Sequence, residues 1–73
     1  MKFHIITHDC CTGYNDKLDY NTRKYAEDAA VEYLKTHEEV FLIKDGYLDK
    51  VFDKTAPKGR NPYTYEIIKF RNN

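Results

Sequence analysis

The chain contains no tryptophan, and it has only two prolines, three glycines and two cysteines among 73 residues. The glycines are isolated, so the sequence has no phosphate-binding loop of the Walker or dinucleotide type. No apolar run approaches the roughly 20 residues of a membrane-spanning helix. These absences argue against a nucleotide-binding domain and against a membrane partner, and we expect no cofactor.

Net charge is also lacking, because twelve Lys and Arg balance twelve Asp and Glu. A neutral protein has no overall field that draws it to nucleic acid or to an anionic membrane. The balance is uneven along the chain: residues 1–53 carry a formal charge of −4 and residues 54–73 carry +4. We expect the two parts to neutralise each other in the fold, with a basic patch near the C-terminal end as the alternative.

The length and the cysteine content indicate one small cytoplasmic domain over residues 1–73. A chain this short buries only about 60% of its surface on folding, so its stability is marginal. Seven tyrosines and four phenylalanines must supply much of the core. We expect no export signal, and two cysteines without one favour a reducing compartment over a disulfide framework.

Two elements are expected in the first half of the chain. The apolar alternation over residues 2–8 predicts a strand, and the polar stretch from residue 9 to residue 20 predicts a long loop. Residues 21–37 have helical periodicity, with Asn21 or Thr22 as the N-cap. The face expected to be buried consists of Tyr25, Ala26, Ala29, Ala30, Tyr33 and Leu34.

Residues 39–53 predict a β-hairpin, because Asp45-Gly46 suits a two-residue type I′ turn. That turn sets the expected pairs, which are Lys44 with Tyr47, Ile43 with Leu48, Phe41 with Lys50, and Val40 with Val51. Alternation then places two sets of side chains on opposite faces. The expected core face is Phe41, Ile43, Leu48 and Phe52, and the other face is Val40, Leu42, Tyr47 and Val51.

The remaining chain predicts a loop over residues 54–62 and a last strand over residues 63–71. The fold class is therefore α+β, a single small domain in the order β-α-β-β-β. One helix is expected on one face of a mixed four-stranded sheet, with the first two strands parallel through a right-handed crossover.

A single helix would leave the second sheet face uncovered unless the last strand and the long loops fold over it. Extended apolar patches on soluble proteins usually mark an interface. We therefore expect a small non-catalytic protein-binding module, either an inhibitor, an adaptor or a regulatory subunit, or a homodimer that pairs this face. Such a chain fits a virus or mobile-element product by its size. The expected interface residues are Val40, Leu42, Tyr47, Val51, Tyr63 and Tyr65.

A nucleic-acid-binding role is the first alternative, since aromatic side chains on a sheet with flanking cations can stack bases and hold phosphates. The cations concerned are Lys54, Lys58, Arg60, Lys69 and Arg71. The zero net charge and the acidic first half of the chain oppose this interpretation.

Redox or metal sensitivity through Cys10 and Cys11 is the second alternative. Adjacent cysteines do not match the C-x₂₋₄-C spacing of structural zinc sites, and nearby acids oppose a reactive thiolate. On the expected topology His37 lies near His4 and far from His8, so the candidate metal ligands are divided between opposite ends of the domain. We accordingly expect no native metal site and no catalytic nucleophile.

Overall fold

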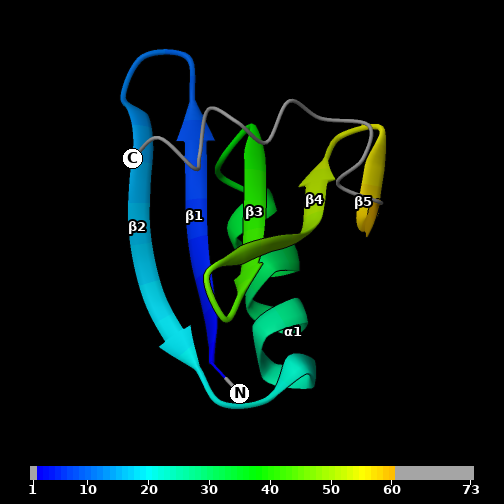
Figure 1. Ribbon diagram of the computed structural model, residues 1–73. Helices are drawn as coiled ribbons and strands as arrows, with labels where there is room; N and C mark the ends of the chain where they lie inside the picture. Colours follow the sequence, from blue (N-terminus) through cyan, green and yellow to red (C-terminus); the bar gives the residue numbers. More distant parts are fainter. Residues whose placement is uncertain (1, 61–73) are drawn as a thin grey trace.

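A computed structural model describes residues 2–60 of the chain. They form the elements β1 (Phe3–Asp9), β2 (Gly13–Tyr20), α1 (Arg23–Leu34), β3 (Glu39–Lys44), β4 (Tyr47–Asp53) and β5 (Ala56–Arg60). The strands build one antiparallel sheet in the order β2-β1-β3-β4-β5, and α1 covers one of its faces (Figure 1). The domain is therefore α+β with two layers, as expected in outline.

The expected loop over residues 9–20 is wrong, because most of it forms β2. Residues 10–12 make a short turn, and Gly13 after it has φ of +74°, a conformation that glycine adopts without strain. β2 is predominantly polar and, among the described strands, lies at an edge of the sheet next to β1 alone. An edge strand of this kind lacks the apolar alternation by which strands are recognised.

The presence of β2 also overturns the parallel crossover. The chain reverses direction once before it enters the helix, so β1 and β3 pair antiparallel. The predicted order β-α-β-β-β becomes β-β-α-β-β-β, and the mixed four-stranded sheet becomes an antiparallel sheet of five strands within residues 2–60. β5 occupies part of the expected loop over residues 54–62, and the expected strand over 63–71 lies outside the described residues.

The helix follows its sequence signals closely. Thr22 is the N-cap, and its hydroxyl oxygen accepts a hydrogen bond from the backbone N–H of Tyr25 at 3.4 Å. Ala26, Ala30 and Leu34 are buried against the sheet, as predicted. Tyr25 is the exception: its side chain was expected in the buried stripe, yet the residue is 66% exposed.

The hairpin of β3 and β4 has the predicted turn, with positive φ at both Asp45 and Gly46. The pairs next to the turn are the predicted ones, but the register shifts by one residue after Ile43, because Asp49 is a surplus residue in β4. Phe41 therefore pairs with Val51 rather than with Lys50, and Val40 pairs with Phe52.

This β-bulge exchanges the two faces beyond the turn, since side chains alternate with a period of two. The core beneath α1 consists of Phe3, Ile5, Ala26, Ala30, Leu34, Val40, Leu42 and Phe52. Of the four hairpin residues expected in this core only Phe52 is present. Asp49 is held by Arg23 of α1 at 2.5 Å, and the same guanidinium lies 5.2 Å from the ring centre of Phe3.

The centre of the opposite sheet face is not an open apolar surface. Phe41 and Val51 point to that face and are 1% and 0% exposed. The prediction that the sheet face opposite α1 is apolar and exposed to solvent is therefore wrong for the central strands. Within residues 2–60, no helix is long and apolar enough to cross a membrane.

The revised register makes a prediction about stability. Leu42→Ala removes a fully buried side chain and should lower the free energy of unfolding by about 2–5 kcal/mol, whereas Leu48→Ala, at a half-buried position, should cost less. Urea titration of both variants measures the difference. A larger loss for Leu48→Ala would support the register without a bulge.

Candidate functional site

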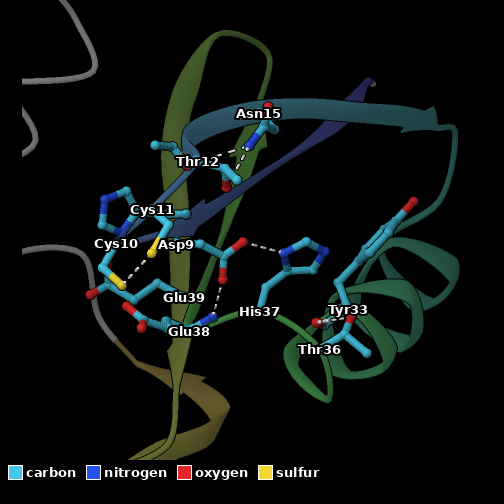
Figure 2. Close-up of polar contacts among 12 residues, drawn as sticks. Asp9, Cys10, Cys11, Thr12, Asn15, Tyr33, Thr36, His37, Glu38 and Glu39 are labelled. Atoms are coloured by element: carbon cyan, nitrogen blue, oxygen red, sulfur yellow. Dashed lines mark hydrogen bonds and ion pairs between the residues drawn. The ribbon is translucent and has the colours of Figure 1, made fainter.

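The turn between β1 and β2 brings two free thiols together at the surface. Cys10 and Cys11 are both exposed, and their sulfur atoms lie 3.5 Å apart (Figure 2). Neighbouring residues of a regular strand point to opposite faces, so this proximity is a property of the turn. It is the closest grouping of soft ligand atoms in the part of the chain that the structure describes.

Asp9 fixes one side of this turn to the connection between α1 and β3. Its Oδ2 lies 2.6 Å from Nδ1 of His37, and its Oδ1 accepts the backbone N–H of Glu38 at 3.0 Å (Figure 2). The hydrogen bond from His37 and that from the Glu38 backbone hold the pKa of Asp9 below its usual value, although desolvation acts in the opposite direction. The thiol turn is therefore anchored to the end of the helix.

This contact corrects the expected position of His37. The antiparallel pairing of β1 and β3 returns the chain to the Asp9 end of β1, where His8 pairs with Glu39. His37 consequently lies at the end that carries His8 and the cysteines, and away from His4. The expected separation of His37 from the thiols came from the parallel crossover, which the structure does not contain.

The other side of the turn is held within β2. The side-chain amide of Asn15 donates to the hydroxyl of Thr12 and to the carbonyl of Gly13, each at 3.4 Å (Figure 2). The turn therefore has side-chain contacts on both flanks, and the backbone that carries the thiols is constrained.

The surroundings of Cys10 disfavour a thiolate at neutral pH. Its hydrogen bond with the thiol of Cys11 raises its pKa, and so do the hydrogen bond and the negative charge of the Glu38 carboxylate. A nucleophilic cysteine needs the opposite, a pKa lowered by a cation or a helix N-terminus. The geometry therefore favours a neutral dithiol over an activated nucleophile.

Each of the three histidines lies beside a carboxylate. His8 Nδ1 is 3.1 Å from Glu39, and His37 contacts Asp9. His4 bridges two aspartates of β2, with Nδ1 at 2.6 Å from Asp19 and Nε2 at 2.9 Å from Asp16. Both nitrogens of His4 can donate to these acceptors only if the ring is protonated at both positions. No group of three or more His, Cys, Asp or Glu within residues 2–60 is arranged to hold a metal ion.

The expected interface residues are dispersed by the corrected register. Val40 and Leu42 are completely buried beneath α1, and Val51 is completely buried on the other face. Tyr47 alone among the described members is exposed, at 69%. Tyr63 and Tyr65 lie outside the described residues.

Three large apolar side chains that are more than 60% exposed occur at one end of the domain: Leu18, Tyr25 and Tyr47. We call these three residues the apolar end. Sequence reasoning placed Leu18 in a loop and Tyr25 in the helix stripe, so it missed both. The pair Asp45-Gly46 located Tyr47 correctly at the start of β4.

The cations of the nucleic-acid alternative are partly engaged inside the fold. Lys54 donates to the carbonyl of Leu34 at the end of α1, and Arg60 contacts Asp53 at 2.7 Å. Lys58 is exposed. The remaining two, Lys69 and Arg71, lie outside the described residues.

The electrostatics of the turn predict a rise in thiol reactivity when a charge is removed. Glu38→Gln should make alkylation of Cys10 by iodoacetamide severalfold faster near pH 8, because the pKa of this thiol is no longer raised by the carboxylate. Mass spectrometry of the two cysteines measures the rates. Glu39→Gln is the control, because it removes the same charge from a carboxylate that contacts His8, and it should leave the alkylation rate at Cys10 nearly unchanged. An equal increase in both variants would contradict a specific effect of Glu38 on Cys10.

The His4 bridge predicts a dependence of stability on pH. Partial burial lowers the pKa of His4, but the hydrogen bonds and charges of Asp16 and Asp19 outweigh it and raise the pKa above 6.5. The stabilisation is therefore complete below about pH 6.5 and is lost as the pH rises through the raised pKa. His4→Gln should destabilise the domain more at about pH 5.5 than at about pH 8.5 in urea titrations.

The lower limit of this window follows from Asp19. The hydrogen bond from His4 lowers the pKa of Asp19 below 3.8, so its part of the stabilisation is present above that value and is lost as the pH falls through the lowered pKa. Lys24→Gln removes an exposed cation from the helix and is the control. An equal effect of His4→Gln at both pH values would contradict a doubly protonated His4.

Comparison with known proteins assigns no role to these residues. No protein-family model matches the chain, and neither a curated protein nor a solved structure matches it. The candidate sites therefore depend on the geometry described above.

Proposed function

We propose that this chain is a small non-catalytic protein-binding domain of the cytoplasm, acting as an inhibitor, adaptor or regulatory subunit. The observation that supports the proposal is the apolar end, where Leu18, Tyr25 and Tyr47 are 65%, 66% and 69% exposed. Exposed large apolar side chains at the same end of a small domain favour a protein interface, and tyrosine is enriched at such interfaces.

The three residues come from different elements that meet at the same end of the fold. Phe3 pairs with Tyr20 at the end of β2 and with Lys44 at the end of β3, and Lys44 pairs with Tyr47. Only residues 21 and 22 separate β2 from α1, so Tyr25, in the first turn of the helix, lies at this end as well (Figure 1). The apolar end therefore comprises one side chain each from β2, α1 and β4.

Contact through side chains is favoured over the addition of a strand to the sheet. Both edges of the described sheet carry features that disfavour strand pairing. Lys17 and Leu18 of β2 lie opposite the single residue Ile5 in a β-bulge, and β5 contains Pro57. The partner is therefore expected to offer an apolar surface that accepts Leu18 and the two tyrosines.

Nucleic acid is the less favoured partner. Leu18 offers no aromatic face for stacking a base, and Lys54 and Arg60 already make contacts within the domain. The face that carries His4 is lined by carboxylates, including Asp16 and Asp19. These charges repel a phosphate backbone.

The test compares binding by the native chain and by a triple variant, Leu18→Ser, Tyr25→Ser, Tyr47→Ser. We expect a protein from the producing cells to be retained by the native chain and, once purified, to bind it with at least 100-fold higher affinity than it binds the triple variant. Val31→Ser is the matched control, because it changes an exposed apolar residue further along α1 and should leave the affinity unchanged. Circular dichroism establishes that all variants are folded.

Light scattering after size exclusion distinguishes a second copy from another partner. A dimer that the triple variant abolishes would identify the same chain as the partner. Equal retention of every bound protein by the native chain and the triple variant, together with a monomer at high concentration, would contradict a role of the apolar end.

A further inference from the structure

We propose that Cys10 and Cys11 form a bidentate binding site for a thiophilic divalent cation of the Zn²⁺ and Cd²⁺ class. The site lies on the turn between β1 and β2, and it is independent of the apolar end at the opposite end of β1 (Figures 1 and 2). It rests on the positions of the two sulfur atoms and on the charges around them.

The separation of the sulfur atoms suits a chelated ion. A zinc–thiolate bond is about 2.3 Å long, so two thiolates at tetrahedral positions lie roughly 3.8 Å apart. The sulfur atoms of Cys10 and Cys11 are 3.5 Å apart before any ion is bound. Binding therefore needs only a small adjustment of two exposed side chains.

A disulfide between the same residues fits the turn less well. Consecutive Cα atoms are about 3.8 Å apart across a trans peptide, whereas the Cα atoms of a disulfide usually lie about 4.4–6.8 Å apart. No cis peptide is present among the described residues. The sulfur atoms would also have to approach from 3.5 Å to about 2.05 Å. The turn is thus better suited to holding an ion between the sulfurs than to joining them.

The contacts on both flanks of the turn constrain the backbone that carries the two thiols. Asp9 attaches one flank to His37 and to the backbone of Glu38, and Asn15 attaches the other flank to Thr12. A chelating pair that is already constrained loses less conformational entropy when it binds. Both thiols remain exposed, so an ion reaches them from solvent.

The local charges favour a cation. The carboxylate of Glu38 is close enough to hydrogen-bond with Cys10, and Asp9 also lies on this side of the turn. Negative charge that disfavours a free thiolate favours a thiolate neutralised by a divalent cation. The surroundings that suppress nucleophilic chemistry at these cysteines thus support metal binding.

The binding step balances without any change of oxidation state. Each S–H bond is broken as an S–metal bond forms, so two protons are released to solvent for each ion bound, and the hydrated ion loses the waters that exceed the two remaining tetrahedral positions. Cys10 and Cys11 provide two ligands, and water completes the remaining positions, consistent with no described cluster of three protein ligands. Binding should strengthen as the pH rises, because the thiols must lose protons.

The experiment is an anaerobic titration of the reduced full-length chain with Cd²⁺, followed by the ultraviolet absorption of the cadmium–thiolate bond. We expect saturation at one ion per chain and an absorption increase corresponding to two thiolates. Calorimetry with Zn²⁺ in buffers of different ionisation enthalpy should report the release of two protons.

Cys10→Ser and Cys11→Ser should each weaken binding more than 100-fold, whereas Thr12→Ser, in the same turn, should bind like the native chain. All three positions are exposed, so the variants should keep the fold. Loss of binding in both cysteine variants with retention in Thr12→Ser supports the proposal. Binding without thiolate absorption, or unchanged in either cysteine variant, would overturn it.

Discussion

The antiparallel pairing of β1 with β3 is the constraint on which the rest of the domain depends. Because β2 reverses the chain before α1 begins, the helix returns to the Asp9 end of β1 rather than to its start. This return brings His37 and Glu38 against the thiol turn. The other end of β1 receives the beginning of α1 and the turn of the β3–β4 hairpin. Strand direction therefore separates the apolar end from the cysteine turn.

Elements that depend on nearby residues were predicted from the sequence. The N-cap at Thr22, the buried alanines of α1 and the turn at Asp45-Gly46 are all set by interactions within a few residues. Local sequence patterns of this kind can be recognised without knowledge of the fold. The class, α+β with one helix on a sheet, follows from them.

Elements that depend on distant contacts were not predicted. β2 is stabilised in part by Asp16 and Asp19, whose partner His4 lies on another strand. The bulge at Asp49 coincides with a contact to Arg23, which is 26 residues away. Neither partner is indicated by the residues around it, so the sheet register and the face beneath the helix were assigned wrongly.

The candidate sites show the same limit. The pattern identified Cys10 and Cys11 as chemically interesting and located Tyr47, but it could not place His37 beside the turn or Leu18 and Tyr25 at the surface. The positions of His37 and Leu18 depend on β2 being a strand. Recognising the possibility of a hairpin across residues 3–20 would have placed His37 correctly.

The surplus residue Asp49 has a consequence for how this chain can vary over generations. Loss of that one codon would leave a regular hairpin in which Lys50, Val51 and Phe52 keep their observed partners on β3, so Phe52 would stay beneath the helix. A hairpin that kept Asp49 but lost the bulge would instead set Val51 opposite Val40, towards the helix, and would direct Phe52 away from it. The bulge, which coincides with the contact between Asp49 and Arg23, therefore decides which side of β4 faces the helix.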